Sequence, residues 1–166
     1  MPDPIEYFLN STTSIVLYQT IEISHPDFSQ VFRLVRNNSS GLVATLEDAS
    51  TASFDFLPMV IDKKDTTDDL DYGIDISFGD LGELLPKELD LIQIADSFDT
   101  KPVLIYRSFR SDDLSGPLEG PVTLEISKLA FNKRGAEIEA ISPQANLHKT
   151  GLIYRLIDFP TIRGLL

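Results

Sequence analysis

Alternation of hydrophobic and polar residues is the dominant pattern along the chain. In SIVLYQTIEI (14–23), the hydrophobic side chains of Ile15, Leu17, Ile21 and Ile23 occupy every second position. Successive side chains of a β-strand point to opposite faces, so this period of two predicts a half-buried strand. The same alternation predicts further strands over residues 30–36, 42–47, 53–61, 74–78, 102–109, 121–129, 136–141 and 151–157.

The segments between these strands are rich in turn-forming residues. NNSSG separates residues 30–36 from 42–47. Asn and Gly tolerate positive φ, and we therefore expect these two strands to form a hairpin. Pro58 interrupts the alternation over 53–61, because proline has no N–H to donate to a neighbouring strand.

One segment has helical spacing. Over residues 80–97, Asp80 and Glu83 have the spacing of an N-terminal capping box, and leucines recur every three or four positions behind them. Pro86 favours a later start, because a proline in the first turn loses no hydrogen bond. A second short helix over residues 4–10 is the alternative that raises the number of helices from one to two.

These elements define the expected architecture. We expect a mainly β fold (α+β), built as an antiparallel β-barrel or sandwich of about eight strands with one or two short helices. We expect one domain over residues 1–166, with an extended C-terminal tail from about residue 158 to 166.

Composition narrows the classes of function. The chain has no cysteine, which excludes disulfides and thiolate metal sites, and no apolar run approaches the roughly 18 residues of a membrane span. The N-terminus MPDPIEYFLN is acidic, unlike a secretory signal, so we expect synthesis in the cytoplasm without membrane insertion. With 14 basic and 26 acidic residues the net charge is −12, which argues against nucleic-acid binding.

An acidic stretch is the one candidate for a metal site. In a calcium loop that starts at Asp69, Asp71 falls at position three, but Gly73 falls at five and Asp80 takes the place of the bidentate glutamate at twelve. A solvated loop is therefore the favoured interpretation, and Asp68, Asp69 and Asp71 are kept as the weaker metal candidates.

Catalytic patterns are not found. His25 and His148 stand alone, without the spacing of a zinc or catalytic motif, and each is interpreted as a loop histidine. Glu137 and Glu139 share one face of a predicted strand, as a pair of catalytic carboxylates can, but alternating glutamates are also typical of the wet face of a sheet. We predict no enzyme activity, no catalytic residue and no cofactor.

Arginines and the apolar C-terminal tail are the candidates for protein contacts. Arginine binds carboxylates bidentately across interfaces, which favours Arg107, Arg155 and Arg163, although a simply solvated arginine is an equally good interpretation of any one of them. The tail adds the apolar residues Phe159, Ile162 and Leu165, which a neighbouring subunit would cover.

Several short motifs follow one another in a fixed order. They are TIEISHP (20–26), Arg33 and Arg36 before NNSSG, LEDA (46–49) before FDF and Pro58, IYRSF (105–109), and YRL (154–156) before Phe159-Pro160 and Arg163-Gly164-Leu165. This order resembles a family of small bacteriophage proteins encoded in the tail module. The chain departs from that family at Thr161-Ile162, where Gly-Leu is usual, and at Gly79-Asp80, where Asp-Asn is common.

The resemblance implies a structural role in the virion. The implied function is a component of the tail tip or baseplate hub of a long-tailed phage, made in the host cytoplasm and forming an oligomeric ring that joins the tail tube to the adsorption apparatus. Its implied partners are copies of itself and other tail proteins, such as the distal tail or tube, hub, tail fibre or tape measure. Two alternatives remain: a calcium-dependent module that binds the host surface, and a tail-assembly chaperone absent from the mature virion.

Overall fold

The computed structural model describes residues 15–64, 72–79, 84–95, 100–132 and 135–143, and it confirms the prediction of a mainly β fold. Nine strands and one helix lie within these residues. The strands are β1 (Leu17–Ser24), β2 (Phe32–Val35), β3 (Leu42–Thr45), β4 (Thr51–Phe56), β5 (Met59–Lys63), β6 (Gly73–Phe78), β7 (Val103–Arg110), β8 (Glu119–Asn132) and β9 (Gly135–Ile141).

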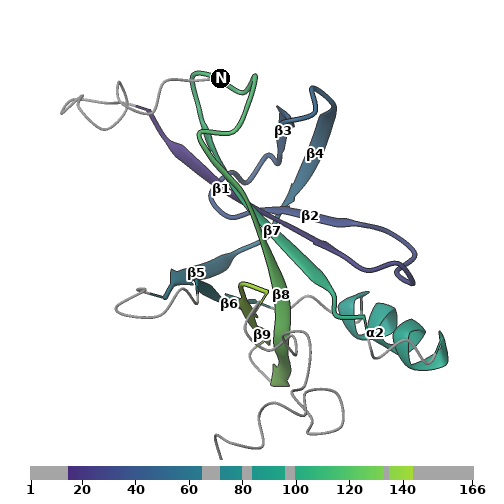
Figure 1. The fold of residues 1–166 in the computed structure, drawn as a ribbon. Helices are drawn as coiled ribbons and strands as arrows, with labels where there is room; N and C mark the ends of the chain where they lie inside the picture. Colours follow the sequence, from purple (N-terminus) through teal and green to yellow (C-terminus); the bar gives the residue numbers. More distant parts are fainter. Residues whose placement is uncertain (1–14, 65–71, 80–83, 96–99, 133–134, 144–166) are drawn as a thin grey trace, which may run out of the picture.

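All nine strands belong to one open sheet (Figure 1). Their order is β3-β4-β2-β1-β7-β8-β9-β6-β5, so β3 and β5 are the two edge strands. Neighbouring strands are antiparallel, except for the short parallel pair of β2 and β4. The strand predicted over 53–61 is divided at Pro58 into β4 and β5, as the missing N–H of proline requires.

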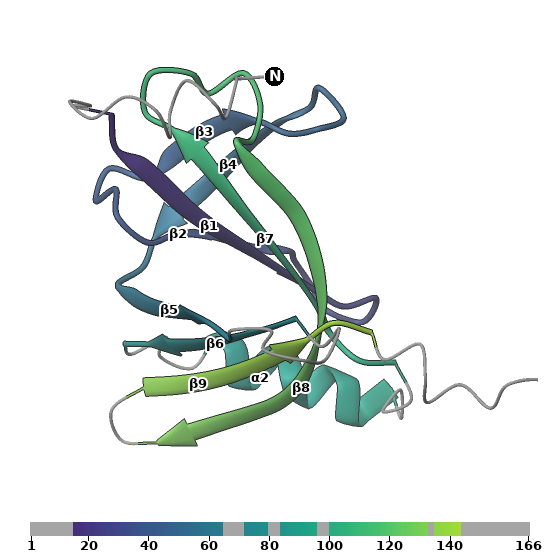
Figure 2. The same ribbon diagram turned by 60° about the vertical axis from the view of Figure 1, so that its left-hand side comes forward.

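The sheet folds over on itself, and β8 makes the turn (Figure 2). β8 is 14 residues long and pairs with β7 near its start and with β9 near its end. Its register shifts between Ile126 and Lys128, a bulge that bends a strand. The main core lies between the two halves, as in a sandwich, and includes Ile21 and Ile23 of β1, Tyr106 of β7, Ile74 and Ile76 of β6, and Ile138 of β9.

A second core covers the opposite face of the central strands. Leu34 of β2 faces the main core, whereas the next residue, Val35, points the other way. The β3–β4 hairpin closes over this second face with Leu42, Ala44, Ala52 and Phe54, which pack with Val35 and with Phe109 of β7. The central strands β1, β2 and β7 are therefore covered on both faces.

The helix predicted over 80–97 is present as α2 (Leu84–Ala95), and residues 80–83 and 96–97 lie outside the described part of the chain. It starts two residues before Pro86, which stands in its first turn, where proline is tolerated. Ile92 is buried, the one buried side chain among those of the helix that the structure describes. Glu88 attaches the helix to the loop after β1 by accepting hydrogen bonds from the backbone N–H (2.7 Å) and hydroxyl (2.5 Å) of Ser29.

The predicted hairpin between residues 30–36 and 42–47 is wrong. β2 pairs with β1 and β4, and β3 pairs with β4. The reason lies in Asn37, whose side chain binds the backbone of β1: its Oδ1 accepts from Gln19 N at 3.3 Å and its Nδ2 donates to Leu17 O at 2.6 Å. The NNSSG segment thus continues along β1 before it turns, and β4 occupies the edge of β2 that β3 would need.

Three predictions fall outside the described residues. They are the helix over 4–10, the strand over 151–157 and the extended tail over 158–166.

Candidate functional site

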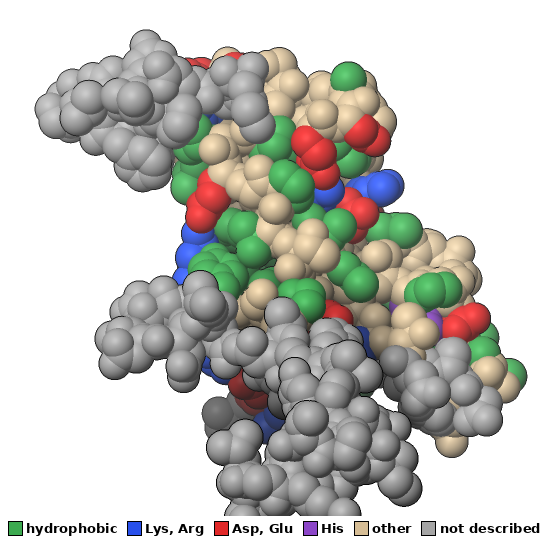
Figure 3. Space-filling view, in the orientation of Figure 1, with side chains coloured by type: hydrophobic (Ala, Val, Ile, Leu, Met, Phe, Trp, Pro, Cys, Tyr) green, Lys and Arg blue, Asp and Glu red, His purple; other side chains and the backbone are tan. Residues whose placement is uncertain are grey.

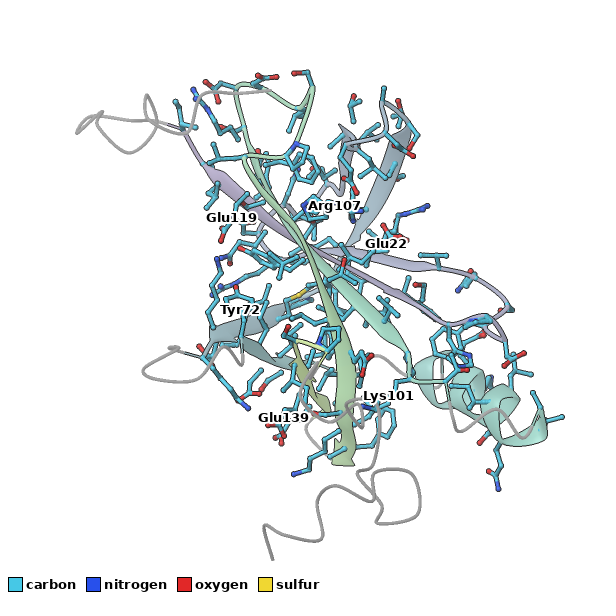
Figure 4. The ribbon with its side chains drawn as sticks, in the orientation of Figure 1. Glu22, Tyr72, Lys101, Arg107, Glu119 and Glu139 are labelled. Carbon is cyan, nitrogen blue, oxygen red and sulfur yellow. The ribbon has the colours of Figure 1, made fainter. Side chains whose placement is uncertain are left out.

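A buried arginine forms the centre of a charged cluster. Arg107 of β7 is only 3% exposed, and its Nε and Nη2 donate to the two carboxylate oxygens of Glu47 at 2.9 and 2.8 Å. Its Nη1 donates to Glu22 of β1 at 3.1 Å, and Glu22 also accepts from Arg33 of β2 at 3.3 Å. Figure 4 labels Arg107 and Glu22 where β1, β2 and β7 cross.

The register of the strands explains this cluster. Thr20 lies opposite both Val35 and Arg107, so Arg107 is on the face that the β3–β4 hairpin covers. Glu47 follows β3 closely in the chain. The bidentate pair therefore holds the hairpin against the central strands, at a site where an unpaired charge would be costly.

Electrostatics agree with this geometry. Hydrogen bonds from the guanidinium of Arg107 lower the pKa of Glu47, against a smaller opposing effect of burial. Burial acts to lower the pKa of Arg107, but the hydrogen bonds and charges of Glu47 and Glu22 outweigh it and raise that pKa. Arg107 and Glu47 are thus stabilised in their charged forms by partners of the same chain. Contact of Arg107 with a neighbouring subunit stays a prediction.

A second charged cluster lies on the face of β5, β6 and β9 that points away from the main core. Asp75 of β6 is directly opposite Asp62 of β5 on one side and Glu139 of β9 on the other. We call these three side chains the carboxylate row. Lys64 lies across it, with Nζ 3.1 Å from Asp75 Oδ1 and 2.5 Å from Glu139 Oε1. Like charges in adjacent positions on neighbouring strands repel, and Lys64, together with Lys128 opposite Glu139 on β8, offsets the three carboxylates only in part.

The carboxylate row lines a shallow hollow of about 430 Å³, together with Ser77, Lys128, Ala130 and Glu137. The hydrogen bond from Lys64 lowers the pKa of Glu139, and hydrogen bonds to Glu139 and Asp75 raise the pKa of Lys64. Within the described residues, no group of three or more His, Cys, Asp or Glu side chains is arranged to hold a metal ion.

Many of the predicted site residues lie outside the described part of the chain. This is so for the metal candidates Asp68, Asp69 and Asp71, for His148, and for the interface candidates Arg155, Phe159, Ile162, Arg163 and Leu165. Glu137 and Glu139 do share the wet face of β9, as the alternation predicts. On the visible face in Figure 3, acidic and basic side chains lie among hydrophobic ones and do not form a large block of one sign.

His25 is confirmed as a hydrogen-bonded histidine of a loop. Its Nδ1 accepts from the backbone N–H of Asp27 at 3.1 Å, and its Nε2 lies 3.0 Å from the carbonyl oxygen of Thr100. The tautomer with its proton on Nε2 satisfies both contacts. His25 thereby joins the end of β1 to the segment before β7.

The outer edge of β5 presents backbone groups without a partner among the described residues. Lys64 N donates to Gly73 O and Gly79 N to Pro58 O, which fixes the hydrogen-bonded positions of the β5–β6 pair. Because such positions alternate in an antiparallel pair, Val60 and Asp62 bond to β6, while Met59, Ile61 and Lys63 direct their N–H and C=O groups outward. We call these outward groups the β5 edge.

The other edge strand, β3, is partly covered. Just after β3, Leu46 N donates to Ser50 O. By the same alternation, the backbone N–H and C=O groups of Val43 and Thr45 point away from β4. Thr45 N donates to Leu114 O at 2.9 Å, so the loop before β8 already binds one of these outward groups. The β5 edge is therefore the more open of the two among the described residues.

Glu22 and Glu47 were not predicted as the partners of Arg107. The available signal was a charged residue in each of two strands that otherwise alternate with apolar residues, TIEI and LIYRSF. Buried charges of opposite sign are expected to pair, but the pairing itself depends on the strand order.

Comparisons with known proteins complete the description. No helix within the described residues is long and apolar enough to cross a membrane. None of the curated proteins matches the chain. Residues 5–134 match the model of the family described as Domain of unknown function (DUF1833), and the chain belongs to that family.

Proposed function

We propose that this protein is a structural subunit of the tail tip or baseplate hub of a long-tailed bacteriophage. In this role it forms an oligomeric ring and contacts other tail proteins. The observation that carries the proposal is an open sheet whose β5 edge has outward backbone groups without partners among the described residues. Such an edge is a template for pairing with another chain.

The motif order that resembles tail-module proteins supports the same proposal. Its residues Glu22, Arg33, Glu47 and Arg107 come from separate motifs and meet in one charged cluster. Residues from separate motifs thus contact one another in the folded chain. The resemblance over all of the motifs therefore applies to the whole fold and not to isolated segments.

Exposed apolar side chains on the edge strands add support. Val60 of β5 is 50% exposed and Val43 of β3 is 60% exposed. An aliphatic side chain on an unpaired edge is a liability for a monomer, and a neighbouring subunit that covers it removes that liability.

Analysis of purified phage particles tests the proposal. Mass spectrometry of virions from the phage that encodes this chain should find it, and labelled antibodies should bind at the tail tip in electron micrographs. A protein that is needed for tail assembly but absent from virions would instead be an assembly chaperone. A protein absent from virions and unable to bind any tail protein would contradict both roles.

A further inference from the structure

We infer that Arg36 and two buried hydroxyls beside it form a binding site for a carboxylate, which an acidic side chain of a neighbouring subunit supplies. The choice of a subunit as the source rests on the proposed function. The site itself rests on three observations within the chain: an arginine without a carboxylate partner, an excess of hydrogen-bond donors around it, and a neutral amide as its acceptor.

Arg36 differs from the other arginines that the structure describes. Those three, Arg33, Arg107 and Arg110, each pair with a carboxylate of the same chain. Arg36 donates from Nη1 to the neutral amide oxygen Oε1 of Gln19 at 2.6 Å, and no ion pair joins it to a carboxylate among the described residues. A guanidinium has five N–H donors, so most of those of Arg36 remain for another acceptor.

The backbone holds Arg36 beside Gln19. Arg36 N donates to Gln19 O at 2.9 Å, directly after β2. Because a guanidinium cannot accept a hydrogen bond, the Gln19 amide directs its oxygen toward Arg36 and its nitrogen toward the hydroxyl of Tyr106, 3.4 Å away. The arginine is therefore already in position before a ligand binds, which lowers the entropic cost of binding.

Two buried hydroxyls add donors to this site. The Tyr106 hydroxyl accepts from Gln19, and burial raises the pKa of Tyr106, so the hydroxyl keeps a proton that it can donate. Ser108 is 0% exposed, and its Oγ has no hydrogen-bond partner among the described residues. A buried hydroxyl without a partner costs stability, and an acceptor that reaches it removes that cost.

The strand register places Ser108 next to Gln19. The two residues are directly opposite each other on β1 and β7. Gln19 O accepts from Arg36 on the side of β2, and Ser108 O accepts from Leu118 N on the side of β8, so they form a non-hydrogen-bonded pair. The side chains of such a pair lie closer together than those of a bonded pair. Arg36, Tyr106 and Ser108 therefore meet around the side chain of Gln19.

The charge of the site favours a carboxylate. Lys63 of β5 lies over the ring of Tyr106, 4.6 Å from its centroid, but its ammonium is paired at 2.6 Å with Glu119, which Figure 4 labels. β4 places Asp55 on the face of Arg36, yet no ion pair joins these two described residues. One uncompensated positive charge matches one carboxylate, whereas a phosphate group brings about two negative charges into an acidic chain.

In the proposed complex, the carboxylate replaces the amide oxygen of Gln19 as the acceptor of Arg36. Arg36 and Gln19 are both half-buried, so an acidic side chain reaches the guanidinium from the surface. The buried hydroxyls of Tyr106 and Ser108 then donate to the same carboxylate. The ligand thus gains a charge-assisted pair and satisfies a hydroxyl that lacks a partner in the free chain.

A titration of the full chain tests the carboxylate chemistry. Sodium acetate should shift the NMR signals of the Arg36 Nε–H and the Gln19 amide and reach saturation, whereas sodium chloride at equal ionic strength should not. Arg36→Gln should weaken acetate binding by about tenfold or more, because the charged donor is lost. Arg33→Gln is the matched control and should leave acetate binding unchanged, since Arg33 is already paired with Glu22. Circular dichroism checks that both variants are folded.

Variants of Gln19 and Ser108 test the arrangement of the site. Gln19→Glu supplies the carboxylate within the chain, so it should raise the melting temperature and abolish acetate binding, while Gln19→Ala should retain binding. Ser108→Ala removes a hydroxyl without a partner, so it should leave the melting temperature unchanged or higher and yet weaken acetate binding. A serine with only a structural role would show a lower melting temperature and unchanged binding.

Purified virions test the source of the carboxylate. A phage that encodes Arg36→Gln should incorporate less of this protein, because the acidic side chain of the neighbouring subunit has lost its guanidinium. If acetate binds through Arg36 but this variant enters virions as wild type does, the neighbouring subunit is overturned as the source.

The remaining outcomes separate the site from the proposed function. Equal effects of acetate and chloride, or unchanged acetate binding by Arg36→Gln, would overturn the inference even if virions contain the protein. If acetate binds as expected but virions lack the wild-type protein, the carboxylate site stands and the tail-tip role fails.

Discussion

The two charged clusters of this protein use the same kinds of side chain for different ends. Around Arg107, one guanidinium meets two carboxylates in a largely buried site, with hydrogen bonds of 2.8 to 3.1 Å to Glu47 and Glu22. In the carboxylate row, on an open face, Lys64 pairs with two of the three carboxylates, Asp75 and Glu139, and Lys128 is opposite Glu139 on the next strand. The first cluster is satisfied within the chain, and the second keeps an excess of negative charge.

This difference follows from the position of each cluster in the sheet. β7 is a central strand covered by the β3–β4 hairpin, so a charge there must be paired before the fold is stable. β5 is an edge strand with one face in water, where the cost of an unbalanced charge is small. Removing a central charge should therefore cost more stability than removing an edge charge.

The largest expected effect is from removing Arg107. Arg107→Ala leaves Glu22 and Glu47 without their shared donor and should lower the free energy of unfolding by about 3–5 kcal/mol. Arg33→Ala is the control, because the Arg33 side chain is 37% exposed and its pair with Glu22 should contribute less than about 1 kcal/mol. Urea denaturation measures both, and equal losses would contradict the distinction between the clusters.

The next effect concerns Glu47 and depends on pH. The pKa of Glu47 is lowered in the folded protein, chiefly by hydrogen bonds from Arg107. The contribution of ionised Glu47 to the free energy of unfolding is therefore fully present above its ordinary pKa of 4.5. It is lost as the pH falls through the lower pKa of the folded protein. Glu47→Gln should cost about 1–2 kcal/mol at neutral pH, and the difference from wild type should shrink under acid conditions.

A double-mutant cycle isolates this pair. In an Arg107→Ala background, Glu47→Gln should have little further effect on unfolding, because the bidentate partner is already gone. Unfolding curves at neutral and acid pH provide the measurement. Additive losses in the double variant would mean that Glu47 stabilises the fold by another route.

The sequence predicted which residues form strands better than it predicted which strands pair with each other. Period-two alternation placed Ile21 and Ile23 correctly on the main-core side of β1, because that pattern depends only on local geometry. It did not reveal that β4 lies between β2 and β3, because the side chain of Asn37 binds the backbone of β1. Turn-forming residues show where a chain can turn, but not which strand comes next.

The site was less predictable for a related reason. Arg107 was recognised as a charged residue able to bind carboxylates, but Glu22 and Glu47 lie 85 and 60 residues away in the chain. The carboxylate row likewise joins Asp62, Asp75 and Glu139, which come together only through the order β5-β6-β9. Long-range partners of this kind require the strand order, which local patterns do not contain.

A smaller effect is expected at Lys64. Lys64→Met removes the positive charge from the carboxylate row, and because Lys64 is largely solvated the loss of stability should be below about 1 kcal/mol and smaller still at high salt. The pKa of Glu139 should rise toward its ordinary value, since the hydrogen bond from Lys64 is the main cause of its lowering. Carboxyl-resolved NMR titration measures this. An unchanged pKa for Glu139 would show that the pair does not persist in solution.

The smallest expected change in stability is the one that best separates the two clusters. Asp62→Asn removes one charge from the carboxylate row and should raise the free energy of unfolding of the monomer by a few tenths of a kcal/mol, because Asp75 then has one repelling neighbour fewer. Asp55→Asn, an exposed aspartate of β4 outside the carboxylate row, is the control and should leave the free energy of unfolding within about 0.5 kcal/mol of the wild-type value. Urea denaturation measures both variants. A charge that serves the fold, as Arg107 does, cannot be removed with a gain in stability. A gain in stability at Asp62 would show that the fold does not depend on this charge, whereas a loss of stability would place Asp62 in the same class as Arg107.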